Sequence, residues 1–331
     1  MSSPAAPAAT MTIRPGDIAV GMDGNLWFPE VGTGLVARMT TAGFVTEFAV
    51  AGAAALGQAI SAGPDGRVWV VGFGADSKVH VWAVGVSGAA ADVVSLGERT
   101  PVLSFLPSGM AAGPDRNVWI ANLSEIDRIS PSGQLSRFPI GEDAIATSIA
   151  SGPDGNLWFV ASLGAFGSRG QGVFRVSTGG SISRVLDESQ PGISSPTSII
   201  AGKDGNLWFA DNGYSELVRV ATSPVGRTNV PFVGASRLAA GSEGDLWITV
   251  PARRSIARFF STSSTEFELP TPLSIPFSIA AGPDGNLWFT EPDVGVVGRI
   301  TPQGEVREFV IGMLTPAPLR RNLAPRLVEN R

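Results

Sequence analysis

Gly282-Pro283-Asp284-Gly285-Asn286-Leu287-Trp288-Phe289 is one of seven copies of an eight-residue motif in this chain of 331 residues. The other copies occupy residues 21–28, 63–70, 113–120, 152–159, 202–209 and 241–248. They hold seven of the eight tryptophans, spaced 39 to 50 residues apart. Repeats of this period are typical of propeller blades. We therefore predict an all-β fold, a seven-bladed β-propeller of four-stranded antiparallel blades.

The last repeat shows how one blade is built. Residues 277–281 are small and apolar, as expected for an inner strand near the axis. Pro283, Asp284 and Gly285 supply a tight turn, and residues 286–290 follow as the second strand. Residues 296–301 and 305–310 complete the blade.

The repeat predicts one closed domain over residues 13–312. Residues 1–12 are predicted to be a disordered Ala/Pro-rich segment, and residues 313–331 a mobile Pro/Arg-rich tail. Residues 305–310 should provide the outer strand of the seventh blade, so we expect the ring to close by sheet packing alone.

The composition excludes several classes of partner. The net charge of −5 and the absence of a Lys/Arg-rich stripe in the repeats argue against nucleic acid. No apolar run reaches the length of a membrane span. The chain has no cysteine, so thiolate chemistry and disulfides are excluded. We predict a monomer that binds neither nucleic acid nor membranes, and favour a cytoplasmic location over secretion with the leader removed.

The repeated residues have structural explanations. Seven equivalent tryptophans fit packing between blades better than ligand binding. Turn formation explains the Asp-Gly pairs better than a ring of metal ligands. Arginine recurs in the third strand, where we expect it to pair with acceptors on a neighbouring strand such as Glu47, Glu266 or Glu308, and blade two carries Ala83 there instead.

The run from Ile279 to Glu291, followed by Val297-Gly298-Arg299-Ile300-Thr301, closely resembles the virginiamycin B lyase family of streptogramin-inactivating enzymes. The resemblance covers all seven repeats. It implies a seven-bladed propeller with a magnesium-dependent site at one end of its channel. In that family a histidine acts as general base, with a second histidine and glutamates nearby, to open a cyclic depsipeptide by elimination.

The two histidines of that family follow a proline at the start of the inner strand in its last two blades. Ser236 and Phe277 occupy the matching positions here. Neither side chain can abstract a proton near neutral pH or bind a metal as imidazole does. The only histidine, His80, is expected in the third strand of blade two as a packed or surface residue. Magnesium is thus implied by the resemblance, but the sequence assigns no metal or other cofactor.

Glu291 matches the family's glutamate at the end of the second strand, and we predict it as a catalytic residue, although a structural role as part of the repeat consensus is equally open. The second strand should end on the face where the first strand begins, so carboxylates at this point should rim the mouth of the channel. The predicted ligand-binding residues on this rim are Glu30, Gln58, Ser108, Thr197, Asp211, Ser236 and Phe277.

Two 50-residue spacings mark insertions in blades two and four. They should lengthen loops on that same face, at residues 72–78, 97–108, 161–171 and 187–196. Phe73, Arg99, Phe105, Phe166 and Arg169 in these loops suit an amphiphilic or aromatic ligand.

These features predict a divergent lyase-family enzyme without streptogramin lyase activity, acting on or binding a small molecule or cyclic peptide at the loop-rich mouth. The alternative is a non-catalytic propeller that binds a ligand or protein. A sugar-lactone hydrolase with an axial calcium would need more convergent oxygen ligands than Glu30, Asp211 and Glu291 provide.

Overall fold

The computed structural model of the protein describes residues 11–98, 106–141, 143–164, 168, 170–187, 192–311, 313–314 and 322–323. Each copy of the repeated motif forms the hairpin turn between the first and second strands of a blade. In the last copy, the backbone N–H of Gly282 donates to the carbonyl of Asn286 at 2.7 Å, and Gly285 adopts a positive φ of 79°. A Cβ atom on Gly282 would lie 2.4 Å from Cδ1 of Trp288, so the ring that follows requires glycine here.

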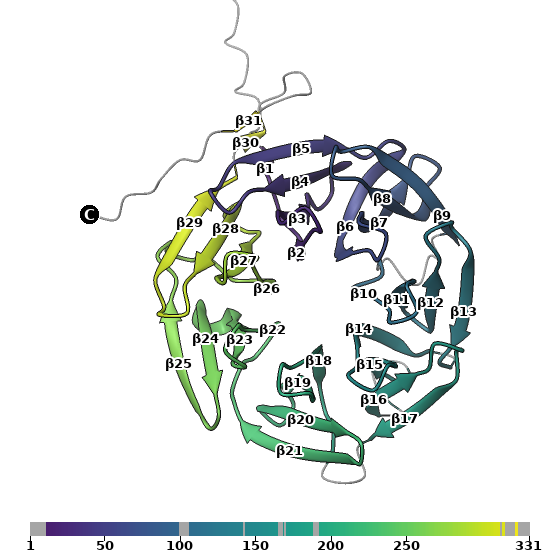
Figure 1. The fold of residues 1–331 in the computed structure, drawn as a ribbon, viewed down its shortest axis with the longest axis vertical. Coiled ribbons are helices and arrows are strands. Elements are labelled where there is room, and N and C mark those ends of the chain that lie inside the picture. The colour runs from purple at the N-terminus through teal and green to yellow at the C-terminus, as the bar shows by residue number, and fades with distance from the viewer. Residues whose placement is uncertain are drawn as a thin grey trace, which may run out of the picture.

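Seven such blades surround a central axis, with the first strand of each innermost and the fourth outermost (Figure 1). Every blade is an antiparallel sheet whose four strands follow the order of the sequence. The prediction of an all-β seven-bladed propeller with four-stranded blades is confirmed. In the described residues the only helix-like element is the 3-10 turn η2 (Pro251–Arg253), and no helix is long and apolar enough to span a membrane.

The strands of the first four blades have the following bounds. Blade one has β2 (Ala19–Val20), β3 (Leu26–Pro29), β4 (Leu35–Met39) and β5 (Val45–Ala49). Blade two has β6 (Ala53–Ala62), β7 (Val68–Gly74), β8 (Lys78–Val84) and β9 (Ala90–Glu98). Blade three has β10 (Gly109–Ala112), β11 (Val118–Asn122), β12 (Glu125–Ile129) and β13 (Leu135–Pro139). Blade four has β14 (Ile145–Ser151), β15 (Leu157–Ser162), β16 (Gln171–Val176) and β17 (Ile182–Leu186).

The last three blades follow the same plan. Blade five has β18 (Pro196–Ala201), β19 (Leu207–Asp211), β20 (Glu216–Thr222) and β21 (Val225–Pro231). Blade six has β22 (Leu238–Ala240), β23 (Leu246–Val250), β24 (Ser255–Phe260) and β25 (Ser263–Glu268). Blade seven has β26 (Ile279–Ala281), β27 (Leu287–Glu291), β28 (Val296–Ile300) and β29 (Val306–Val310).

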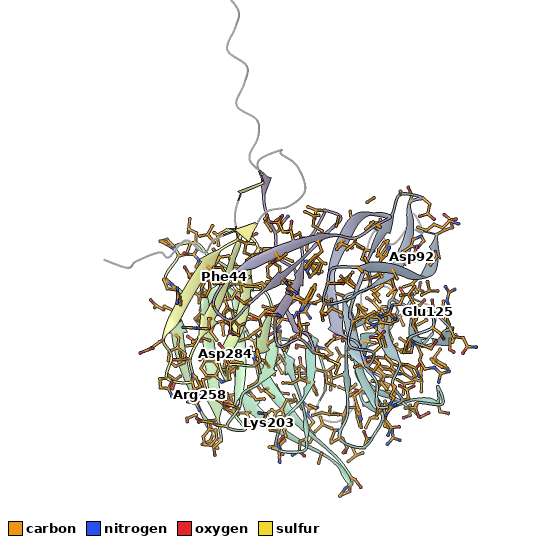
Figure 2. The ribbon with its side chains drawn as sticks, turned by 45° about the horizontal axis from the view of Figure 1, so that its top comes forward. Phe44, Asp92, Glu125, Lys203, Arg258 and Asp284 are labelled. Carbon is orange, nitrogen blue, oxygen red and sulfur yellow. The ribbon has the colours of Figure 1, made fainter. Side chains whose placement is uncertain are left out.

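The alternation of strand direction gives the ring two different faces. The motif turns lie on what we call the turn face, and Lys203 and Asp284, labelled in Figure 2, belong to these turns in blades five and seven. On the opposite face, the loop face, the second strand of each blade ends and the chain enters the next blade.

The core lies between neighbouring blades. The motif tryptophans are at most 8% exposed, and six of them are 0–1% exposed. Trp288 packs with Phe28, Ile18 and Ile13 of blade one, and Trp247 packs with Phe289 of blade seven. The predicted packing role of these rings is confirmed.

Arginines in the third strands join one blade to the next, but not through the acceptors expected from the sequence. Arg128 stacks over Trp119 with its Cζ 5.7 Å from the ring centroid, and its Nη1 donates to the backbone carbonyl of Thr178 in blade four at 2.6 Å. Arg38 and Arg258 donate in the same way to Val86 and Pro302 of the following blade. Of the expected acceptors, Glu266 pairs with Arg253 and Glu308 accepts from Thr271.

Blade two keeps this contact despite having Ala83 in the third strand. Arg67, in the motif turn, stacks over Trp69 with its Cζ 5.5 Å from the ring centroid. It donates to Asp65 at 2.6 Å and to the carbonyl of Pro131 in blade three at 3.0 Å. A different backbone position therefore supplies the missing guanidinium.

The ring closes with contacts between the first and last blades. Thr290 Oγ1 donates to the carbonyl of Gly16 at 2.9 Å, and the N–H of Ile18 donates to Ser278 Oγ at 3.3 Å. As predicted, β29 supplies the outer strand of blade seven. The expectation of closure by packing alone is incomplete, because β1 (Met11–Thr12) pairs with β30 (Met313–Leu314), and β31 (Asn322–Leu323) pairs with β5.

The insertion in blade two lengthens strands as well as loops. Residues 72–74 continue β7, residues 97–98 end β9, and β6 reaches ten residues. Regular pairing across the hairpin satisfies the added backbone groups. Of the aromatic and arginine residues expected in the inserted loops, Phe73 lies in β7, and Arg99, Phe105, Phe166 and Arg169 lie outside the described residues.

Candidate functional site

The loop face near the axis carries the start of each inner strand. The N–H groups of Phe277, Ser236 and Gly16 donate to the carbonyls of Thr290, Thr249 and Pro29 at 2.8, 3.0 and 2.9 Å. These bonds place the residue at the start of each inner strand, which we call its entrance position, beside the end of the second strand, as the alternation of strand direction predicts.

Three of the inner strands are irregular at the entrance position. Pairing shifts register between Leu56 and Ile60 around Gln58, between Ala146 and Ser148 around Thr147, and between Pro196 and Ile199 around Thr197. Register shifts of this kind redirect side chains and are common beside binding sites. The entrance ring therefore differs from blade to blade.

The hydroxyl groups predicted to bind ligand already hold neighbouring blades together. Ser108 Oγ donates to the carbonyl of Thr147 at 3.0 Å, and Thr197 Oγ1 donates to the carbonyl of Ser236 at 3.2 Å. Gln58 is exposed, whereas Ser236 is partly buried. A ligand at this ring would meet hydroxyl oxygens with remaining acceptor capacity, because the hydroxyl protons are engaged.

Arg237, Phe277 and Asp17 bring three blades together at this ring. The guanidinium carbon of Arg237 lies 5.5 Å from the centroid of the Phe277 ring, and Nη2 lies 3.8 Å from Oδ1 of Asp17. The side chains of Arg237 and Asp17 are 22% and 18% exposed. We call these three residues the axial cluster.

Burial raises the pKa of Asp17 above its usual range, although Arg237 and a hydrogen bond with Ser278 partly oppose this effect. Oδ1 of Asp17 accepts no hydrogen bond from the described residues. The axial cluster thus combines a guanidinium, an aromatic ring and a carboxyl. This carboxyl is protonated more readily than that of an exposed aspartate.

Glu30 and Glu291 do not line an open mouth. Both side chains are fully buried, and none of their four carboxyl oxygens has a hydrogen-bond partner among the described residues. Burial, with some repulsion from Glu47 and Glu308 respectively, raises the pKa of each to about 8. The expectation that these carboxylates rim the mouth is therefore wrong as to their exposure, and a catalytic role for Glu291 stays a prediction.

The corresponding residues in two other blades have structural partners. Asp211, fully buried, accepts hydrogen bonds from the N–H groups of Ser194, Ser195 and Gly213 at 3.0, 2.8 and 3.1 Å. Asn122 of blade three donates to Asp127 at 2.8 Å. At these blades the end of the second strand serves to fix the neighbouring loop and strand.

His80 lies in the third strand of blade two, as predicted, two strands outward from the inner strand that reaches the axis. Its Nε2 is 3.1 Å from Oδ1 of Asp76, and its Nδ1 is 2.9 Å from Oδ2 of Asp92. The ring also stacks on Trp82 with centroids 5.5 Å apart. The histidine therefore has a structural environment in the enlarged hairpin.

The residues near the axis do not fit the magnesium site that the family resemblance implies. Ser236 and Phe277 stand at the histidine positions, and Glu291 is enclosed. Within the described ranges no three His, Asp or Glu side chains gather in a way that could hold a metal ion.

Sequence reasoning missed Arg237 and Asp17. Both lie one residue beyond an entrance position, and the signal was present in the repeat. The equivalent residues of the other blades are small, namely Ala59, Gly109, Ser148, Ser198 and Ser278. A charged residue at this place in only two of seven blades marks a departure from the structural repeat.

Comparison with known proteins gives one family. The sequence matches the model of the virginiamycin B lyase family over residues 99–319. No curated protein matches the sequence.

Several solved structures share the fold. One is a catalytically inactive virginiamycin B lyase from Staphylococcus aureus with quinupristin, at 21% identity and a TM-score of 0.69, covering 86% of this chain and 94% of that one. A streptogramin B lyase structure matches at 20% identity and 0.69, covering 86% and 92%. A Kuenenia stuttgartiensis hydrazine synthase chain matches at 17% and 0.68, covering 92% and 100%. Two unrelated activities at similar scores mean that this likeness describes the fold alone.

Proposed function

The chain belongs to the virginiamycin B lyase family, and on this premise we propose that it acts on or binds a small molecule or cyclic peptide at the axial end of its loop face, without streptogramin lyase activity. The axial cluster carries this proposal. It joins a partly exposed arginine, an aromatic ring and a carboxyl from three different blades, at a ring whose other members differ from blade to blade.

The family supports the class of ligand. The related Staphylococcus aureus structure contains quinupristin, so a propeller of this family offers room for a molecule of that size. The turn face, by contrast, repeats nearly the same turn in each blade. Varied side chains can select an asymmetric molecule, whereas near-identical turns offer little means to do so.

The lack of streptogramin lyase activity follows from the side chains at the histidine positions. Serine and phenylalanine cannot act as general bases near neutral pH, and loss of such a base removes roughly 10²–10⁴-fold of rate. If this propeller is an enzyme, we propose that a carboxyl transfers the proton. Asp17 reaches the ring, and Glu291 is our sequence-based prediction.

One observation favours a non-catalytic binding propeller as the second candidate. Glu291 is fully buried, so a ligand on the loop face would touch it only after the surrounding structure opened. A binding function needs no such opening.

Quinupristin provides the test. We expect purified protein to leave quinupristin intact in the presence of magnesium, as followed by mass spectrometry beside the Staphylococcus aureus lyase as positive control. Magnesium-dependent opening of the ring would overturn the absence of lyase activity.

The location of binding is tested by hydrogen exchange with the same compound. Protection should centre on Ser236 and Phe277, and Phe277→Ala should weaken it. Phe44→Ala is the matched control, because Phe44 is an exposed phenylalanine on the turn face (Figure 2). Protection at the motif turns, or equal loss in both variants, would contradict the proposed site.

A further inference from the structure

Arg237 differs from the other arginines that stack on aromatic rings in blades one, two, three and six. Arg38, Arg67, Arg128 and Arg258 each donate to a backbone carbonyl of the next blade. The guanidinium of Arg237 makes no hydrogen bond to any described residue, and its one ionic contact is the 3.8 Å approach to Asp17. A guanidinium carries five N–H donors, so most of those of Arg237 lack a protein acceptor.

These N–H donors are accessible to solvent and therefore to a ligand. None of the Arg237 nitrogen atoms is both buried and without a partner, and the side chain is 22% exposed. The guanidinium carbon lies over the Phe277 ring, 5.5 Å from its centroid. An acceptor would therefore approach along the edge of the guanidinium, where the N–H groups point.

The backbone beneath Arg237 is held from both sides. Its N–H donates to Thr249 Oγ1 at 2.9 Å, and its carbonyl accepts from the N–H of Thr249 at 3.0 Å. Thr249 is fully buried. The next N–H, of Leu238, donates to Ser198 Oγ of blade five at 3.2 Å. A fixed backbone lowers the entropy that ligand binding must overcome.

The charge of Arg237 is only partly balanced. Asp17 is its single acidic neighbour within 4 Å among the described residues, at a distance beyond hydrogen bonding. A second anionic group can thus approach Arg237 without having to displace a hydrogen-bonded partner.

We infer that the axial cluster recognises the carboxylate of a small organic acid, with Arg237 donating to both carboxylate oxygens and the apolar part of the acid lying against the Phe277 side of the ring. This inference rests on the proposed function and names its ligand class. A planar guanidinium matches two carboxylate oxygens with parallel hydrogen bonds. The aromatic wall favours an acid with an apolar body over an inorganic anion.

Phenylacetate is the probe, with phenylacetamide as its neutral counterpart and inorganic phosphate as the anion without an apolar body. Binding to the whole protein is followed by saturation-transfer NMR and by calorimetric titration. We expect phenylacetate to bind more tightly than either of the other two. Arg237→Gln should weaken phenylacetate by roughly 10- to 100-fold, the usual effect of losing hydrogen bonds to a charged group.

Three further variants separate recognition from structure. Arg254→Gln removes a positive charge from the same face of the same blade and should leave phenylacetate binding unchanged. Arg237→Lys keeps the charge but loses the paired donors, and should give an intermediate affinity. Asp17→Asn removes a repulsive charge and should strengthen phenylacetate binding, an effect that a purely structural pair would not produce.

The outcomes distinguish this inference from the proposed function. Equal binding of phenylacetate and phenylacetamide, both lost in Phe277→Ala but kept in Arg237→Gln, would overturn carboxylate recognition and leave a ligand site at the ring. Preference for phosphate, or no phenylacetate binding up to its solubility limit, would also overturn the inference. Quinupristin protection confined to the turn face would overturn the proposed function itself.

Discussion

The indole Nε1–H of Trp158 donates a 2.9 Å hydrogen bond to Oδ1 of Asp154, four residues earlier in the motif. The same carboxylate accepts from the backbone and side chain of Asn156. Five other blades repeat the bond between tryptophan and the turn aspartate, at 3.0 to 3.3 Å. In blade six Glu243 replaces that aspartate, and Trp247 donates instead to Asp245 at 2.8 Å. The repeated turn and the buried ring of the motif are therefore one hydrogen-bonded unit.

We expect Asp154→Asn to lower the free energy of unfolding by about 1–2 kcal/mol, because it removes a charged acceptor from the indole and the turn. Burial alone raises the pKa of Asp154, but the hydrogen bonds from Asn156 and Trp158 lower it overall. A depressed pKa stabilises the fold above the pKa of the unfolded chain, and this stability is lost as pH falls through the folded value. Urea titrations at pH 7 and pH 3 measure both effects. Asp293→Asn, at an exposed ion pair, is the control and should change little.

Trp288→Ala should cost about 3–5 kcal/mol, because it leaves a cavity between blades seven and one. Thermal unfolding followed by calorimetry gives the value. Phe260→Ala removes an aromatic ring that is 54% exposed and should be close to neutral. Equal effects of the two substitutions would mean that Trp288 does not carry the interface.

Glu291→Gln should make stability less dependent on pH above pH 5. Burial raises the pKa of Glu291 to about 8, so the folded protein holds a proton that the unfolded chain releases near pH 4.5. Stability is full below the unfolded pKa and falls as pH rises toward 8, by up to about 1.4 kcal/mol per pH unit for one such carboxyl. Urea titrations between pH 5 and pH 8 should show a shallower decline in the variant. An unchanged decline would mean that Glu291 ionises at its ordinary pKa.

His80 should titrate above the ordinary histidine pKa. Burial alone lowers the pKa of His80, but the carboxylates of Asp92 and Asp76 raise it overall. The remaining charged groups near this hairpin, Lys78 and Glu98, pair with each other at 3.1 Å. The stability that protonated His80 gains from Asp76 and Asp92 is fully present below the pKa of the unfolded chain. It is lost as pH rises through the folded pKa.

Because the chain has one histidine, its imidazole signals in an NMR titration are unambiguous. Asp92→Asn, at the position labelled in Figure 2, and Asp76→Asn should each lower the measured pKa. A wild-type pKa at or below the ordinary value would show that the two carboxylates do not hold the charged ring.

The sequence determines the fold far more fully than the site. The seven motifs place seven of the eight tryptophans and the turn between the first and second strands of every blade, because the interactions they make are local or repeat from blade to blade. Arg237 and Asp17 meet across blade seven, and no local pattern predicts a contact between residues 220 positions apart in the chain. For Glu291 the sequence predicts the position in the strand but not the burial of the side chain. Its place at the end of the second strand was correct, but whether that end opens to solvent depends on how tightly blades six and seven pack.

The arginines that reach into the next blade have an evolutionary consequence. Each acceptor is a main-chain carbonyl at the second residue of the turn between the third and fourth strands, as at Val86, Pro131, Thr178 and Pro302. Every amino acid presents such a carbonyl, so a duplicated blade finds its acceptor whichever blade it is inserted beside. This hydrogen bond between blades thus depends on no particular side chain of the neighbouring blade, which leaves the residues around the axis free to diverge while the bond is kept.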